Sequence, residues 1–135
     1  MHRQLDDRLL ISAQIAVEDV AILAGEGVTL LVNNRPDGED AGQPLAKDIE
    51  HAAERAGIAY RFIPIIRGIG PGDIDSMRDA IAETGDGKML AFCRSGTRSG
   101  LVAALAQRHL GVTREEVERR LEAAGIDSSP IAHLL

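Results

Sequence analysis

The sequence has little cysteine and few aromatic residues: its only cysteine is Cys93, and it contains one tyrosine, two phenylalanines and no tryptophan. A single cysteine excludes an internal disulfide and a Cys-x-x-Cys redox or zinc motif, and it fits a reducing compartment. No apolar run approaches the roughly 20 residues of a membrane-spanning helix, and the polar start of the chain has no signal-peptide pattern. We therefore expect a cytoplasmic protein with a core of leucine, isoleucine, valine and alanine.

An excess of positive charge is also lacking. The formal net charge is −6 and the isoelectric point is near 5.1, which argues against nucleic acid or an anionic membrane as a partner. The four histidines share no metal-ligand spacing, so we expect no metal and no other cofactor. The length of 135 residues predicts a single domain, residues 1–135, that is large enough to bury a core.

Apolar runs alternate with helix-like segments along the chain. Strands are predicted at residues 9–12, 28–33, 58–66 and 88–92, and helices at residues 16–23, 45–56, 74–83, 99–110 and 113–124. This alternation predicts an α/β fold with a central, mainly parallel sheet flanked by helices. Ligands bind beyond the carboxyl ends of parallel strands, so residues 33–35, 67–72 and 93–99 should converge on one edge.

The candidate site is the segment from Cys93 to Ser99, which joins a predicted strand to a predicted helix. Backbone N–H groups of such a loop, together with a helix N-terminus, bind anions and stabilise a thiolate. We predict that Cys93 is a thiolate nucleophile, that Arg98 binds an oxyanion through its bidentate fork, and that Ser99 hydrogen-bonds the sulfur. The alternatives are a small buried thiol for Cys93, a surface salt bridge for Arg98 and a plain helix cap for Ser99. The other loop residues are expected to line the substrate, mainly through their backbone: Arg94, Ser95, Gly96 and Thr97.

Three further candidates follow the neighbouring strands. Asn34 and Arg35 come after the strand at residues 28–33, at the expected edge, and are predicted to contact substrate; a satisfied turn is the alternative. Asp73 is a candidate general acid, although it could equally cap the helix that begins near Ile74.

A cysteine in this setting is typical of two classes of enzyme. Phosphatases of the protein-tyrosine and dual-specificity type place five residues between the nucleophilic cysteine and the arginine. Rhodanese-type sulfurtransferases carry a persulfide on the cysteine of a shorter loop. Here four residues separate Cys93 from Arg98, so the loop by itself leaves phosphorylated and sulfur-donor substrates open. A third interpretation is a module that binds small oxyanions without turnover.

From about residue 9 to about residue 126, the chain resembles the phosphatase-like domain of beta-lactamase-hydrolase-like proteins, a bacterial family, and several short segments carry the resemblance. They are Ser12-x-Gln14, Asn-Asn-Arg-Pro-Asp-Gly-Glu at residues 33–39, Gln43-Pro44, Ile63-Pro64-Ile65 and the loop at residues 93–99. The resemblance implies a protein-tyrosine/dual-specificity phosphatase-like fold. It leaves the reaction open, because members are described as candidate phosphatases and as candidate sulfurtransferases.

One position departs from the dual-specificity phosphatases. Those enzymes usually carry an acidic residue just after the Ile-Pro-Val-like strand, where this chain has Ile66 and Arg67. General acid catalysis contributes roughly 10²- to 10⁴-fold, so its absence would slow hydrolysis more than sulfur transfer. We predict a cysteine-dependent phosphatase-like hydrolase, with rhodanese-type sulfur transfer as the alternative.

Overall fold

A five-stranded sheet forms the centre of the computed structural model, which describes residues 2–135. Its strands are β1 (Arg3–Asp6), β2 (Leu9–Ser12), β3 (Val28–Asn33), β4 (Ala59–Phe62) and β5 (Lys88–Phe92). They lie in the order β1-β2-β5-β3-β4, and all neighbours are parallel except β1 and β2. The predicted mainly parallel sheet is therefore confirmed, with β5 at its centre.

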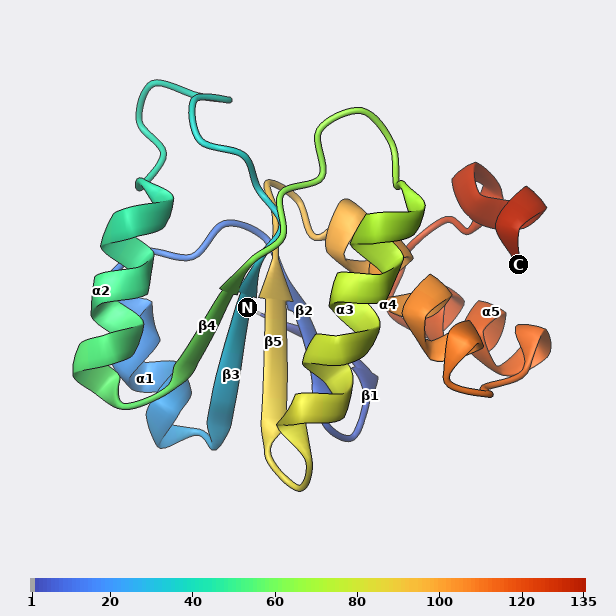
Figure 1. Cartoon of the computed structure of the whole chain (residues 1–135), viewed down its shortest axis with the longest axis horizontal. Helices are drawn as coiled ribbons and strands as arrows, with labels where there is room; N and C mark the ends of the chain where they lie inside the picture. The colour runs from blue at the N-terminus through green and yellow to red at the C-terminus, as the bar shows by residue number, and fades with distance from the viewer. Residues whose placement is uncertain (1) are drawn as a thin grey trace.

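Helices cover both faces of this sheet (Figure 1). One face carries α1 (Asp19–Gly25) and α2 (Ala46–Ala56), whereas the other carries α3 (Pro71–Thr84), α4 (Thr97–His109) and α5 (Arg114–Ala123). The chain ends in a short 3₁₀ helix, Ser129–Leu134. No helix within residues 2–135 is long and apolar enough to span a membrane.

Burial of both faces of the central strand β5 explains why its sequence is apolar without alternation. Met89 and Ala91 pack into the core beneath α3, α4 and α5, whereas Leu90 and Phe92 pack into the core beneath α1 and α2. A strand buried on both faces needs apolar residues at every position. Helix α4 is buried almost as completely, so the loop between β5 and α4 starts and ends on fixed elements.

The strand predicted at residues 58–66 is shorter than expected. Strand β4 ends at Phe62, and Pro64 lies beyond it on the edge of the sheet, where a residue without an N–H leaves no ladder hydrogen bond unmade. The backbone nevertheless stays beside its neighbour: Ile63 N–H donates to the carbonyl of Asn33 at 2.9 Å, and Ile65 N–H donates to that of Asn34 at 2.9 Å. The extended segment after β4 is thereby held at the edge where the site lies.

Two elements were not predicted, and two helices, α3 and α4, start earlier than expected, at Pro71 and Thr97. Strand β1 has only one buried apolar residue, Leu5, and its pairing with β2 is a tertiary contact. The terminal 3₁₀ helix has no periodic apolar pattern. Helix α3 begins at Pro71 rather than at Ile74, because proline suits the first turn of a helix.

Candidate active site

Cys93 lies at the carboxyl end of β5 and is fully buried. Its N–H donates to the carbonyl of Ser12 on β2 at 3.3 Å, which fixes the start of the loop. Its Sγ accepts a hydrogen bond from the N–H of Gly96 at 3.1 Å, and α4 begins at the next residue, Thr97. The sulfur therefore faces a backbone donor at a helix N-terminus, an arrangement that stabilises a thiolate.

Gly96 has the backbone conformation that makes this contact. Its φ of 96° lies in the left-handed region that favours glycine. A Cβ at this position would collide with the guanidinium of Arg3, and it would lie 3.3 Å from Ile11 Cγ2 and 3.4 Å from the carbonyl carbon of Ser12. Arg3 itself donates to the carbonyl of Ser95 at 3.0 Å and braces the loop from β1.

Gly96→Ala should therefore unfold more readily and lose the contact between the loop N–H and the sulfur. We expect a loss of at least about 1–2 kcal/mol in the free energy of unfolding, because left-handed backbone costs a non-glycine residue that much. Denaturant unfolding measures the loss. The matched control is Gly42→Ala, at a position where φ is not left-handed and a Cβ would meet nothing within 4 Å. Equal stability of the two variants would contradict the assignment.

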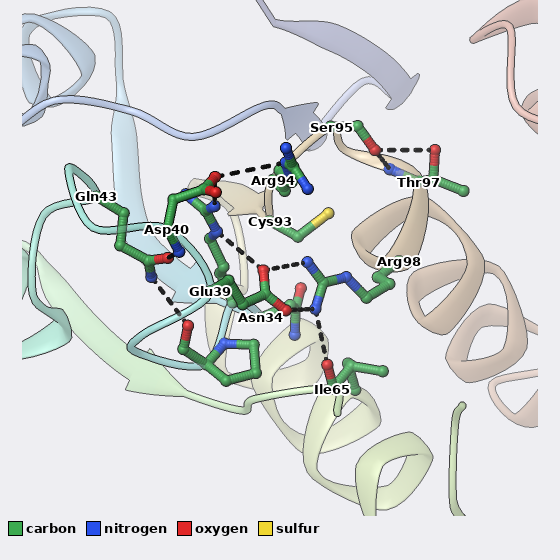
Figure 2. A network of polar contacts seen from close by, with 12 residues as sticks. Asn34, Glu39, Asp40, Gln43, Ile65, Cys93, Arg94, Ser95, Thr97 and Arg98 are labelled. Atoms are coloured by element: carbon green, nitrogen blue, oxygen red, sulfur yellow. Dashed lines mark hydrogen bonds and ion pairs between the residues drawn. The ribbon is translucent and has the colours of Figure 1, made fainter. Parts of the chain in front are cut away.

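Arg98 lies in the first turn of α4, and its guanidinium is held by two other loops (Figure 2). Nη1 donates to Glu39 Oε2 at 2.8 Å and to the carbonyl of Ile65 at 2.9 Å, and Nη2 donates to Glu39 Oε1 at 2.8 Å. The hydrogen bond to Glu39 raises the pKa of Arg98, and the nearby Cys93 sulfur raises it further. The arginine is thus fixed next to the cysteine.

Glu39 is the carboxylate partner of two arginines. Besides Arg98 it accepts a hydrogen bond from Arg35 Nε at 3.0 Å. The hydrogen bond from Arg98, followed by that from Arg35, lowers the pKa of Glu39 to about 2, against the opposing effect of burial. The carboxylate is consequently ionised at every pH at which an enzyme of this kind would be assayed.

The stability of the protein should fall in acid partly because of this carboxylate. Since folding lowers the pKa of Glu39 from 4.5 to about 2, its contribution is fully present above pH 4.5 and is lost as the pH falls toward 2. Glu116 on α5, held by Arg119 and Arg120, has its pKa lowered to about 2 as well and adds to the trend.

Urea unfolding at about pH 7 and about pH 3 measures this effect. The wild type should lose more stability between the two pH values than Glu39→Gln, which has no carboxyl group to protonate at that position. An equal loss in the two proteins would show that Glu39 is not held in this way.

Ser99 differs from its predicted role. Its hydroxyl donates to Asn34 Oδ1 at 2.8 Å and not to the sulfur of Cys93. The Nδ2 of Asn34 donates to the carbonyl of Ile63 at 2.9 Å, and both residues are buried. Ser99 and Asn34 therefore tie α4 to the segments that follow β3 and β4.

Arg35 is buried, and protein oxygens hold its guanidinium. Besides Glu39, these are Gln14 Oε1 at 3.1 Å from Nη1 and Asp40 Oδ2 at 2.7 Å from Nη2. It was predicted to contact substrate, but its place in the structure is that of a brace for the loop after β3. Arg94 is exposed, with Nε 3.6 Å from Asp40 Oδ2, so its guanidinium lies at the rim of the site.

The two hydroxyl residues of the loop interact with each other. Ser95 Oγ donates to Thr97 Oγ1 at 3.2 Å and accepts the N–H of Thr97 at 3.4 Å, on the exposed side of the loop. The predicted role of the two residues in lining the substrate, mainly through their backbone, stays a prediction. The contacts between them shape the turn into α4.

The carboxylate of Asp73 caps the start of helix α3. Its Oδ2 accepts the N–H of Gly70 at 2.9 Å, so Asp73 caps α3 from the third position of the helix and not, as predicted, as the residue before its first turn. Asp37 is used in a similar way, since its Oδ1 accepts the N–H of Ala46 at the start of α2 at 2.8 Å. Within residues 2–135, no group of three or more His, Cys, Asp or Glu side chains could hold a metal ion.

The sequence model for the phosphatase-like domain of beta-lactamase hydrolase-like proteins matches residues 2–110. The chain belongs to this family. Beta-lactamase hydrolase-like proteins of Xylella fastidiosa (strain Temecula1) and Agrobacterium fabrum are 39% and 33% identical over 91% and 92% of the chain. The chain spans only 29% of the length of either relative.

Solved structures place this phosphatase-like domain in a wider fold group. A crystal structure from Neisseria meningitidis, described as a candidate phosphatase, has a TM-score of 0.78 and 32% identity and covers 97% of this chain and 94% of its own. Tk-PTP and PTPMT1 have TM-scores of 0.75 and 0.71 at 18% and 16% identity. They cover 98% and 99% of this chain, and 92% and 91% of their own chains. The expected fold of the protein-tyrosine phosphatase type is therefore confirmed.

The predicted convergence of three loops on one edge of the sheet is confirmed in part. The segments after β3 and β5 meet through Asn34 and Ser99, and through Glu39 and Arg98. In the segment after β4, the carbonyl of Ile65 accepts a hydrogen bond from Arg98. The predicted residues 67–72 instead lead to the start of α3.

Four residues around the loop were not predicted as part of the site, and one of them, Asp40, had no signal in the sequence. Glu39 and Gln14 stood only among the sequence marks of the family, and that resemblance was the available signal. Arg3 had no signal, because the strand that carries it was not predicted.

Proposed function

We propose that this domain is a cysteine-dependent phosphatase-like hydrolase that acts on small phosphate monoesters, with Cys93 as the nucleophile. The observation that supports this function best is the Cys93 sulfur beside a loop N–H and the fixed guanidinium of Arg98. Family membership and the similarity to phosphatase structures support the same class of reaction.

In the proposed first step, the thiolate of Cys93 attacks phosphorus, and a sulfur–phosphorus bond forms as the bond to the leaving oxygen breaks. Water then attacks the cysteinyl phosphate, releasing inorganic phosphate and restoring the thiolate. Loop N–H groups and Arg98 would stabilise the negative charge on the non-bridging oxygens through both steps.

None of the carboxylates around the site is placed to donate a proton to the leaving oxygen. The carboxylates of Asp73 and Asp37 cap helices, and that of Glu39 is ionised between two arginines. Monoesters whose leaving groups depart without protonation, such as p-nitrophenyl phosphate, should therefore be better substrates than alkyl phosphates.

Rhodanese-type sulfur transfer remains the second candidate, because four residues rather than five separate Cys93 from Arg98. In that reaction the Cys93 thiolate takes the outer sulfur of thiosulfate and releases sulfite. The resulting persulfide then gives this sulfur to cyanide, forming thiocyanate. The loop N–H that contacts the thiolate would contact the persulfide instead.

Two parallel assays decide between the reactions, with Cys93→Ser as the blank in each. The phosphatase proposal expects phosphate release from p-nitrophenyl phosphate above the blank, and no thiocyanate above the blank. Thiocyanate formation that depends on Cys93, with phosphate release equal to the blank, would replace the proposal with sulfur transfer. If neither assay shows activity above the blank, the domain is an oxyanion-binding module and the proposed hydrolase is wrong.

A further inference from the structure

The hydrogen bonds of Arg98 leave one particular edge of its guanidinium free. Of the five N–H donors of an arginine, two on Nη1 go to Glu39 and to the carbonyl of Ile65, and one on Nη2 goes to Glu39. The remaining donors are Nε–H and the second N–H of Nη2. In a planar guanidinium these two point in the same direction, as a fork that fits two oxygens of an oxyanion.

This free edge faces the nucleophile. In Figure 2 the sulfur of Cys93 lies on the opposite side of the guanidinium from the carbonyl of Ile65, to which Nη1 donates. Arg98 and the sulfur are close enough that the sulfur contributes to the raised pKa of Arg98, after the larger effect of Glu39. A phosphoryl group attacked by the sulfur would therefore meet the free fork and not the occupied one.

We propose that Glu39 is the positioning residue for Arg98: it holds the end of the guanidinium so that Nε–H and Nη2–H point at the oxyanion above Cys93. The inference rests on the proposed function, since it concerns the same site. Glu39 stays on Arg98 when an oxyanion binds, and the two anions occupy different edges of one guanidinium.

The support behind Glu39 matches a fixed role. Its carboxylate is bound by Arg35 Nε at 3.0 Å, and Arg35 is itself held by Gln14 and Asp40 and has only 3% of its surface exposed. A carboxylate anchored by a buried arginine keeps its place, which is what orienting another side chain requires.

Two other roles for Glu39 make opposite predictions. If Glu39 occupied the place of the substrate, its removal would free Arg98, and oxyanions would bind more tightly. Loss of a negative charge near the site favours anion binding in the same direction. If Glu39 donated the proton to the leaving group, its removal would slow esters with poor leaving groups far more than p-nitrophenyl phosphate.

The test compares Glu39→Ala and Glu39→Gln with the matched control Asp37→Asn. Asp37 lies on the same loop and carries the same charge, but its recorded contact is the cap of α2, which asparagine can still provide. Inorganic phosphate is titrated by calorimetry into each protein, and kcat and KM are measured for p-nitrophenyl phosphate and phenyl phosphate.

Positioning predicts that Glu39→Ala binds phosphate about 10-fold more weakly or worse, and lowers kcat/KM for both esters by roughly 10- to 100-fold, because a misplaced binding group costs that much. Glu39→Gln keeps one acceptor oxygen for the guanidinium and should fall between alanine and the wild type. Asp37→Asn should match the wild type in phosphate affinity and in kcat/KM.

Tighter phosphate binding by Glu39→Ala would overturn the proposal in favour of a blocking carboxylate. A selective loss on phenyl phosphate, with unchanged phosphate affinity, would overturn it in favour of a general acid. If Glu39→Ala does not fold, Glu39→Gln decides by the same criteria.

The binding measurement also separates this inference from the proposed function. Wild-type protein without turnover that depends on Cys93, but with phosphate binding weakened by Glu39→Ala, would refute the hydrolase and retain the positioning role. Absence of phosphate binding by the wild type would refute the positioning role itself.

Discussion

Cys93→Ser should lower the hydrolysis of p-nitrophenyl phosphate by at least about 10³-fold, because a serine hydroxyl is not ionised near neutral pH and is a far weaker nucleophile than a thiolate. The chain has no second cysteine that could substitute for Cys93. The sulfur of Cys93 is fully buried and faces the Gly96 N–H, so an oxygen at the same place keeps a hydrogen-bond partner. Initial rates at saturating substrate measure the loss.

The same variant supplies its own control. Cys93→Ser should fold normally and should still bind inorganic phosphate, because the loop backbone and Arg98 are unchanged. Calorimetric titration and denaturant unfolding check these two points. A variant that folds, binds phosphate and retains more than about a tenth of the wild-type rate would refute nucleophilic catalysis by Cys93, since loss of a nucleophile costs far more.

Arg98→Lys should lower kcat/KM by roughly 10²- to 10³-fold, although the positive charge is retained, because the loss of one preorganised donor to the reacting group has a cost of this order. A lysine ammonium has three donors on one atom. It cannot satisfy Glu39 and the carbonyl of Ile65 at their present places while also presenting a planar fork to an oxyanion. Arg98→Ala should lose at least as much.

Arg94→Lys is the matched control for this prediction. Arg94 lies in the same loop, but its side chain is 68% exposed, and its recorded partner is Asp40 at 3.6 Å. An exposed ion pair of this kind contributes little, so kcat/KM should change less than about threefold. Equal losses in Arg94→Lys and Arg98→Lys would show that the site needs positive charge in general and not the fork of Arg98.

The central strands and the nucleophile loop could be read from the sequence, because their determinants are local. Strands β2, β3 and β5 were predicted at their observed bounds, since continuous apolar runs of this length form buried parallel strands. The order of strand, loop and helix around Cys93 follows from the residues on either side of it. A lone cysteine next to glycine and arginine in such a loop indicates an anion site by the same local logic.

Strand β1 and the role of Ser99 could not be read in that way. Strand β1 is polar, and it becomes a strand only because β2 provides a partner for it. The hydroxyl of Ser99 turns to Asn34, a residue 65 positions earlier in the chain, and not to the sulfur six positions earlier. Nothing in the local sequence specifies that choice.

The sequence by itself determined which groups the site contains: a thiol, an arginine and a loop at the start of a helix. The tertiary structure alone decided which donors of Arg98 are taken, because Glu39 and the carbonyl of Ile65 reach it from two other strand ends. The physical reason is that parallel strands distant in the chain bring their carboxyl ends to one edge of the sheet. Side chains there find partners that no spacing along the chain reveals.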